Sequence, residues 1–133
     1  MAAIEGRARE LLEDGKNFVK LTTLDDEGAP YSVVIWGDVE NGQVAVNSAE
    51  GRKWPQYVRN NPVVEVVVPN WENPYEYVRV RGRIVEDTHE GADEHIDAMA
   101  KKYLGQDKYP FRQMGEQRVK VYIEPEVVKG ANE

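Results

Sequence analysis

The 133-residue sequence contains no cysteine. This absence excludes disulfides, thiolate metal sites and a cysteine nucleophile. No apolar run approaches the roughly 20 residues that a membrane-spanning helix requires, and the first 15 residues lack the apolar core of a secretion signal. Together these absences favour a cytoplasmic protein that does not enter a membrane.

Positive charge is also in short supply. The chain has 17 Lys and Arg against 24 Asp and Glu, which gives a formal net charge of −7. General nucleic-acid binding needs a basic surface, so we expect no nucleic-acid partner. Any anion site must instead be a local cluster of positive charge on an acidic protein. The length favours one domain over residues 1–133.

Histidine is scarce, with only two in the chain. His89 and His95 lie six positions apart among Asp and Glu, a spacing that does not place them on one helix face and that matches no HExxH motif. An exposed acidic helix face explains this region better than a metal site. No nucleophile elbow or Ser–His–Asp pattern occurs. We therefore expect no metal and no indispensable catalytic side chain.

The sequence does contain a series of short strand patterns between helical ones. Apolar spacing predicts helices near residues 4–15, 52–61 and 90–105. β-Branched and alternating residues predict three strands within 17–48 and further strands at 62–68, 75–87 and 117–125. Hairpin-type links dominate, and no GxGxxG or Walker A sequence occurs. This order predicts a mainly β, six-stranded antiparallel sheet closed into a small barrel, with helices outside it.

The polar turn "NSAEGRKW", residues 47–54, lies between a valine-rich strand and the predicted helix at 52–61. Ser48 offers a hydroxyl, Gly51 allows close backbone approach, and Arg52 and Lys53 offer charged donors. The helix start adds free N–H groups and a partial positive charge. These features together are typical of a phosphate site. The alternative is a solvated helix start with a capping serine.

The strand at 75–87 carries arginine at alternate positions 79, 81 and 83. Such a row is typical of a solvated outer face paired with neighbouring carboxylates, which is the interpretation we favour; a positive wall beside an anionic ligand is the alternative. Three tryptophans stand near predicted strand ends or turns. They suit a core or interface, or the lining of a flat cavity for an aromatic cofactor. These are Trp36, Trp54 and Trp71.

Several segments, in this order, resemble the flavin and deazaflavin oxidoreductases of the split β-barrel superfamily, the pyridoxamine 5′-phosphate oxidase-like group. They are "GAPYSVVIWGD", "NSAEGRKWPQYVRNNPVVEVVV" and "NPYEYVRVRGRIVE". The later "EGADEHIDAMAKKYLGQDKYPF" is closer still to the branch that uses the deazaflavin coenzyme F420. The resemblance covers nearly the whole chain. It implies a split β-barrel flanked by short helices, and a homodimer with two cofactors at the subunit interface.

The resemblance also implies which residues hold the cofactor. The strand ending at Trp36 would lie along the tricyclic ring, mostly through backbone groups. Asn47 and Ser48 would lie near the ribityl chain and phosphate, while Arg52 and Lys53 would bind the phosphate itself. The full expected set is Val33, Val34, Ile35, Trp36, Asn47, Ser48, Gly51, Arg52, Lys53 and Trp54.

The implied function is hydride transfer from the reduced deazaflavin to a small conjugated or electron-poor acceptor. An FMN-dependent oxidase or reductase is one alternative. The lysine directly after Arg52 matches the flavin binders, whereas many deazaflavin-using relatives have a lysine where this chain has Trp54. A non-catalytic protein that binds such a cofactor is the other alternative. We expect the deazaflavin to be preferred, with its anionic tail near Lys16, Lys20, Arg59 or the arginines at 79–83.

Overall fold

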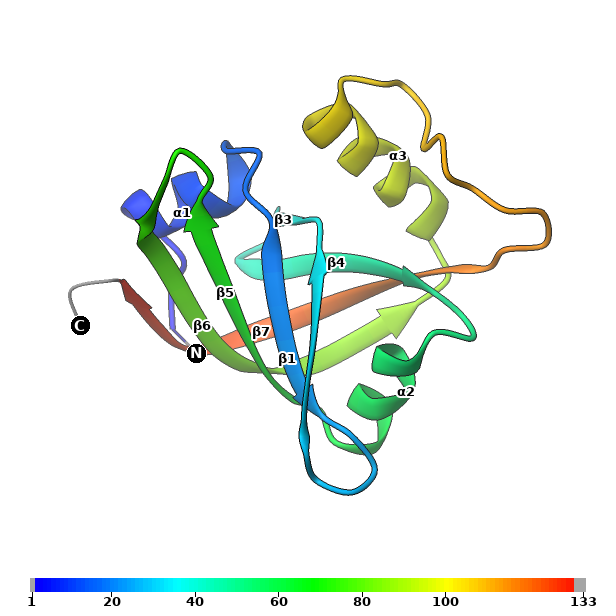
Figure 1. Ribbon diagram of the computed structural model, residues 1–133, viewed down its shortest axis with the longest axis horizontal. Helices are drawn as coiled ribbons and strands as arrows, with labels where there is room; N and C mark the ends of the chain where they lie inside the picture. Colours follow the sequence, from blue (N-terminus) through cyan, green and yellow to red (C-terminus); the bar gives the residue numbers. More distant parts are fainter. Residues whose placement is uncertain (1, 131–133) are drawn as a thin grey trace.

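The computed structural model describes residues 2–130. Their elements are α1 (Gly6–Glu13), β1 (Val19–Leu24), β2 (Pro30–Ile35), β3 (Gly37–Glu40), β4 (Gln43–Ala49), α2 (Lys53–Asn60), β5 (Val63–Asn70), β6 (Asn73–Thr88), α3 (Ala92–Leu104) and β7 (Arg118–Gly130). The strands form one sheet in the order β2-β1-β5-β6-β7-β4-β3, with antiparallel neighbours throughout. The sheet curls into a half-barrel (Figure 1). The predicted mainly β, antiparallel class is confirmed.

The predicted count of six strands is wrong, because the described chain has seven. The region 17–48 forms four strands instead of three, with a break at Trp36 between β2 and β3. β2 pairs with β1 and β3 pairs with β4, at opposite edges of the sheet. A single residue therefore carries the chain from one edge to the other. Both halves keep strand geometry, so the side-chain pattern alone does not show the change of partner.

The inner face of the curled sheet holds the core. Side chains alternate along each strand, so one set points inward. Helices α1 and α2 add Leu11, Leu12, Trp54 and Val58 to the same cluster, at two separate ends of the sheet (Figure 1). The valine, leucine and isoleucine residues of the strands with 0% exposure are Val19, Leu21, Val44, Val46, Val66, Val68, Val80, Val119, Val121 and Ile123. Burying each such side chain contributes roughly 1.5–3 kcal/mol.

Helix α3 packs on the outside of the sheet, against β4 and β7 (Figure 1). Ala92, Ile96 and Met99 on one face of the helix are buried and Tyr103 is half-buried, in agreement with the apolar spacing that predicts the helix. Glycines flank the helix at both ends, with Gly105 in the left-handed conformation that ends many helices. The chain then runs without regular structure to β7. This segment and α3 build one side of the site described next.

Candidate functional site

The sheet is open between β2 and the end of β4. β3 pairs with β4 only as far as Val46, so within the described chain residues 47–49 have a strand neighbour on the β7 side alone. β2 likewise pairs with β1 and with no second strand of the described chain. The backbone groups on these free edges are available to bind a ligand.

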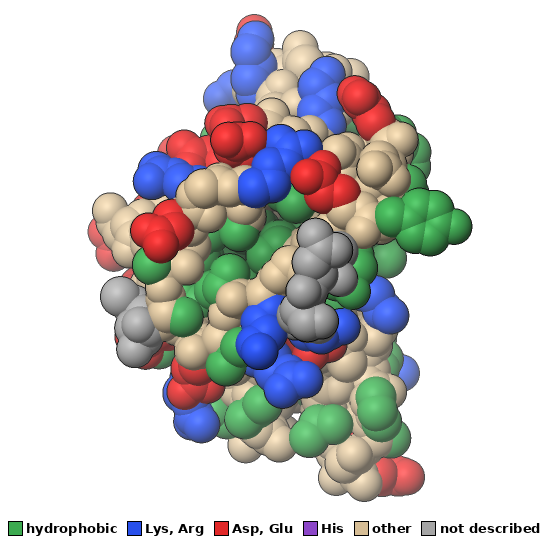
Figure 2. Space-filling model, turned by 90° about the vertical axis from the view of Figure 1, so that its left-hand side faces the viewer, with side chains coloured by type: hydrophobic (Ala, Val, Ile, Leu, Met, Phe, Trp, Pro, Cys, Tyr) green, Lys and Arg blue, Asp and Glu red, His purple; other side chains and the backbone are tan. Residues whose placement is uncertain are grey.

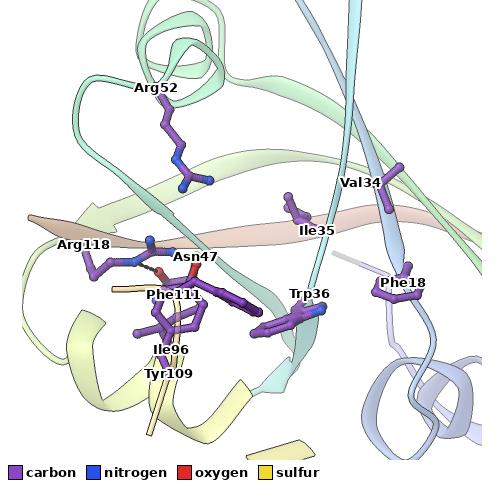
Figure 3. Close-up of a pocket in the computed structure, with 10 residues that line it drawn as sticks. All are labelled: Phe18, Val34, Ile35, Trp36, Asn47, Arg52, Ile96, Tyr109, Phe111 and Arg118. Atoms are coloured by element: carbon purple, nitrogen blue, oxygen red, sulfur yellow. Dashed lines mark hydrogen bonds between the residues drawn. The ribbon is translucent and has the colours of Figure 1, made fainter. Parts of the chain in front are cut away.

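Two hollows lie beside this opening. The first, which we call the turn cleft, has a volume of about 510 Å³ and is lined by Tyr31, Val33, Val34, Ile35, Gly51, Arg52, Lys53 and Trp54. The second, which we call the aromatic pocket, has a volume of about 200 Å³ and is lined by Phe18, Val34, Ile35, Trp36, Asn47, Arg52, Ile96, Tyr109, Phe111 and Arg118 (Figure 3). Both hollows share Val34, Ile35 and Arg52. A molecule lying along the end of β2 would therefore contact both.

The turn before α2 leaves its helix start uncapped. Gly51 has φ of +94°, a left-handed conformation that favours glycine. Arg52 is the N-cap residue in an extended conformation, and no side chain caps the helix there. Pro55 lies in the first turn, where its missing N–H has no partner to lose. The alternative of a capping serine is wrong, because Ser48 is not the N-cap.

Arg52 and Lys53 are exposed, and neither side chain forms an ion pair or a hydrogen bond with any part of residues 2–130. Arg52 is the one arginine in this range without an ion pair; all the others have a carboxylate partner. In Figure 3 the Arg52 side chain extends from the start of α2 toward the aromatic pocket. The turn therefore offers two uncommitted cations beside uncapped helix N–H groups.

Ser48 and Asn47 point to opposite faces of β4. Ser48 lies on the same face as the core residue Val46, is 1% exposed, and its Oγ has no hydrogen-bond partner within residues 2–130. A buried hydroxyl without a partner costs free energy, and such groups are normally satisfied by water or a ligand. Ser48 lines neither hollow, whereas Asn47 lines the aromatic pocket.

The Asn47 amide is the centre of a buried hydrogen-bond network. Its Oδ1 accepts from Arg118 Nε at 2.9 Å, and its Nδ2 donates to the Ala92 carbonyl at 2.9 Å and faces His95 Nδ1 at 3.0 Å. Since Nδ2 only donates, His95 Nδ1 accepts and Nε2 carries the proton toward Asp38 Oδ1, 3.2 Å away. Both N–H groups of the Asn47 side chain are thus committed to holding α3 on the sheet.

This network corrects the interpretation of His95. The exposed acidic helix face predicted around it is wrong for this residue, which is 6% exposed. His89 is exposed and contacts Glu50 at 2.6 Å. Within residues 2–130, no group of three or more His, Cys, Asp and Glu side chains is placed to hold a metal ion. None of the helices described is long and apolar enough to span a bilayer.

Aromatic rings that contact one another line the aromatic pocket, and Tyr103, which does not line it, supports two of them. Trp36 stacks on Tyr103 with ring centroids 5.2 Å apart and an angle of 8°, and Tyr103 stacks in turn on Phe18 at 5.9 Å. Tyr109 meets the edge of Trp36 at 6.0 Å and contacts Phe111 at 5.7 Å. These contacts present flat apolar surfaces to the pocket.

The three tryptophans have different environments. Trp36 lines the aromatic pocket, as the cavity interpretation predicts. Trp54 is 3% exposed and belongs to the core, although it borders the turn cleft. Trp71 is 68% exposed at the tip between β5 and β6, where its ring meets the edge of Phe18 at 5.2 Å.

Two side chains of α3 fix the crossover from β2 to β3. Tyr103 donates its hydroxyl to the Asn17 carbonyl at 2.6 Å and accepts from the Gly37 N–H at 3.2 Å, and burial raises the pKa of Tyr103 to about 12. Lys102 Nζ donates to the carbonyls of Leu12 at 2.6 Å and Gly37 at 2.8 Å. Burial lowers the pKa of Lys102. These hydrogen bonds fix the backbone of Gly37, the residue that follows Trp36.

The arginines of β6 form a paired outer face, as favoured from the sequence. Arg81 lies 3.1 Å and Arg79 3.8 Å from Glu65, while Arg83 lies 3.7 Å from Glu126. Positive and negative side chains are interspersed on the face shown in Figure 2. None of these arginines lines the turn cleft or the aromatic pocket.

The other residues expected near an anionic tail differ from one another. Arg59 binds both oxygens of Glu50, at 2.9 and 3.1 Å, and also Asp87 at 3.1 Å, so its charge is already balanced. Lys20 is exposed on β1, directly across from Val34 at the border of both hollows. Lys16 is exposed, and neither hollow includes it.

Half of the lining of the aromatic pocket lies outside the predicted site. These residues come from segments far apart in the sequence: the start of β1, helix α3, the segment after it, and the first position of β7. Apolar residues carry no signature that separates pocket lining from core, and a lone arginine at a strand start gives no signal of burial. The residues are Phe18, Ile96, Tyr109, Phe111 and Arg118.

Comparison with known proteins places this geometry in a family. The family model described as pyridoxamine 5′-phosphate oxidase matches residues 4–131. The chain belongs to this family, which confirms the resemblance predicted from the sequence. Among curated protein sequences there is no match.

Solved structures share the fold. One described as an F420 reductase has a TM-score of 0.79 at 20% identity, over 94% of this chain and 97% of that one. A conserved hypothetical protein from Mycobacterium tuberculosis has a TM-score of 0.66 at 19% identity, over 85% and 75%. HupZ from Group A Streptococcus has a TM-score of 0.67 at 14% identity, over 92% and 89%. At such identities the likeness establishes the fold.

Proposed function

We propose that the protein is an oxidoreductase that binds coenzyme F420 between β2 and the turn before α2. The observation that carries the proposal is the pair of uncommitted cations, Arg52 and Lys53, at an uncapped helix start. A phosphate there would receive charge-assisted hydrogen bonds from both side chains and further donors from the helix N–H groups. Family membership and the fold shared with an F420 reductase support the same class of cofactor.

The remaining expected residues suit the rest of such a cofactor. The free edge of β2 from Val33 to Ile35 would hold the tricyclic ring through backbone groups, beside the flat surface of Trp36. The unpartnered Oγ of Ser48 and the backbone of Asn47 lie at the end of β4, on the other side of the opening. The bound cofactor would supply hydride chemistry, and the protein would supply position and a dry pocket.

The acceptor of the hydride would lie in the aromatic pocket. This pocket shares Val34, Ile35 and Arg52 with the turn cleft, so a molecule in it lies next to a ring held on β2. Its aromatic walls suit a small conjugated or electron-poor compound. No described side chain is placed as an obvious base, and the proton that follows the hydride would come from solvent.

We further propose a homodimer with the site at its interface. Outward residues of β2 and β5 remain exposed, with Val34 at 68% and Val63 at 48%. Exposed apolar side chains beside a cleft are typical of an interface. Sedimentation at micromolar concentration is expected to give twice the 15.2 kDa chain mass. A monomer that binds the cofactor tightly would contradict an interface site.

FMN remains the competing cofactor, because Arg52 and Lys53 are adjacent as in flavin binders. F420 carries an anionic tail beyond its phosphate, and Lys16 and Lys20 are the exposed candidates for it to which no carboxylate of the described chain is paired. A titration of cofactor-free protein with each compound, followed by competition over a salt series, separates them. We expect F420 to bind more tightly and its affinity to fall with salt. Displacement by equimolar FMN, or salt-independent binding, would contradict the proposal.

A further inference from the structure

The aromatic pocket contains a positive group to which the proposed function assigns no role. Arg118 is the first residue of β7, and its side chain is 3% exposed. It nevertheless lines the pocket, together with Trp36 and Phe111 (Figure 3). A buried arginine at the wall of an apolar cavity is uncommon, because removing its charge from water is costly unless partners compensate.

The partners of Arg118 fix the position of its guanidinium but accept hydrogen bonds from only some of its N–H groups. Nε donates to Asn47 Oδ1 at 2.9 Å and Nη1 donates to Glu116 Oε1 at 2.9 Å. Nη2 makes no hydrogen bond within residues 2–130. The ring of Tyr109 lies 5.1 Å from the guanidinium carbon. Since a guanidinium carries five N–H groups, a fixed and largely desolvated donor remains for a ligand.

Arg118 is the charged donor that the α3 side of the pocket offers, and the Tyr109 hydroxyl is a neutral donor on the same side. The amide N–H groups of Asn47 are already committed to Ala92 and His95. Arg52 stands at the turn end of the pocket, where the proposed function uses it for the phosphate. Glu116 balances the charge of Arg118 without lining the pocket. An acceptor atom placed among the aromatic rings would therefore meet Arg118.

We propose that Arg118 binds the carboxylate of a planar aromatic or conjugated molecule whose ring lies among Trp36, Tyr109 and Phe111. The planar guanidinium matches a carboxylate better than a point charge does, and the apolar walls strengthen the contact by excluding water. The aromatic walls favour a flat ring. If this molecule is the hydride acceptor, that role rests on the proposed function. The existence of a carboxylate-binding site at Arg118 does not depend on it.

The test uses the full chain and two probes of one shape, 2-naphthoate and its neutral amide, 2-naphthamide. Calorimetry with the wild-type protein is expected to show naphthoate bound about tenfold more tightly or better, the usual worth of one charge-assisted contact. Arg118→Lys keeps a positive charge next to Glu116 but loses the planar guanidinium, so the preference for naphthoate over naphthamide should decrease. R118M combined with E116Q leaves no unpaired buried charge, and the preference should vanish.

Arg81→Gln is the matched control, because Arg81 is 64% exposed and lines neither hollow. This variant should keep the full preference, and thermal unfolding confirms that each variant is folded. Equal affinity of the two probes, binding of neither, or an undiminished preference in both Arg118 variants would overturn the proposal.

A parallel arm separates the two sources of an anion. F420 and FMN are titrated into the same Arg118 variants, and their affinities should be unchanged. Weaker cofactor binding with an unchanged naphthoate preference would assign Arg118 to the cofactor and overturn the proposal. If neither cofactor binds the wild-type protein but the naphthoate preference depends on Arg118, the proposed function fails and the Arg118 site stands.

Discussion

The two sides of the aromatic pocket differ in how their polar side chains are engaged. On the α2 side, Arg52 and its neighbour Lys53, which lines the turn cleft only, have no side-chain partner within residues 2–130. On the α3 side, Asn47 joins Arg118, His95 and a helix carbonyl in one bonded network. Groups without partners are available to a ligand, whereas groups with partners hold the structure together. Affinity for the proposed cofactor should therefore depend mainly on the α2 side, and folding stability on the α3 side.

The outer face of β6 sharpens this comparison. It carries three arginines, more than the turn before α2, but each lies within 4 Å of a carboxylate. A high density of positive charge in the sequence thus does not define an anion site. What distinguishes the turn is that its charges are left unbalanced at an uncapped helix start.

The largest expected effect is on the α2 side. Changing Arg52 and Lys53 together to alanine should weaken cofactor binding by about 3–6 kcal/mol, since each charge-assisted contact is worth about 1.5–3 kcal/mol. The thermal unfolding midpoint should not change, because neither side chain is bonded within the described chain. The control is R81A with R83A on β6, which should leave affinity intact. Equal cofactor affinity of the Arg52/Lys53 variant and the wild type would remove the basis of the comparison.

On the α3 side, the expected effect is on stability. Asn47→Ala removes one buried hydrogen-bond partner each from Arg118, His95 and the Ala92 carbonyl, so urea unfolding should show a loss of about 2–4 kcal/mol. Asn60→Ala is a control on an exposed amide, whose bond to Asp26 is long at 3.4 Å. It should cost far less. A loss at Asn47 no larger than at Asn60 would show that the network does not hold α3 in place.

The contribution of the α3 side to stability can also be tested at alkaline pH, where Tyr103 loses its proton. Its pKa is raised from 10.0 to about 12 by burial, so the unfolded chain loses this proton first. Burial of the neutral hydroxyl contributes fully to the free energy of unfolding below pH 10. This contribution is lost as the pH rises through 12, a decrease of about 2–3 kcal/mol at 1.36 kcal/mol per pH unit. Lys102 acts in the opposite direction, since its lowered pKa makes stability rise with pH below 10.5.

Urea midpoints measured from pH 9 to 12.5 check this expectation. Tyr103→Phe should abolish the Tyr103-dependent fall, while Tyr75→Phe, at a residue 89% exposed, should leave it unchanged. The same alkaline fall in both variants would mean that Tyr103 does not titrate as its burial requires.

The smallest expected effect concerns the shape of the turn. Gly51→Ala meets no atom within 4 Å but forces a side chain into φ of +94°, which costs roughly 1–2 kcal/mol. Gly28→Ala in the β1–β2 turn carries a similar strain, at φ of +80° and with open space around it. Both should lower the urea midpoint, and Gly51→Ala alone should lower cofactor affinity. Equal affinities in the two variants would show that the turn need not keep this conformation.

The sequence predicts local features of the fold well. Apolar spacing places all three helices, and Leu11, Leu12 and Ile96 are buried as their periodicity requires. The family also follows from ordered segments along the chain. These signals are local because each depends on neighbouring residues within one element or turn.

Features that depend on distant pairing do not appear in the sequence. The break at Trp36 exists because β2 pairs with β1 whereas β3 pairs with β4. The residue pattern of a strand does not show which strand it pairs with. His95 is polar and has acidic neighbours in the sequence. It is nevertheless buried, and it contacts Asn47 of β4 and Asp38 of β3. Arg118 is held by the same amide. Buried polar networks are fixed by tertiary geometry, so sequence spacing does not predict them.

The place of β7 in the sheet bears on the order in which the protein can assemble during synthesis. β7 is synthesised after all the other strands of the described chain, yet it lies between β6 and β4. β2, β1, β5 and β6 can pair earlier, while β4 and β3 form only an isolated hairpin, which is marginally stable by itself. The apolar residues Val44 and Val46 stay exposed in that interval. A ligand held by both β2 and the end of β4 would therefore find a complete site only after β7 has been inserted into the sheet.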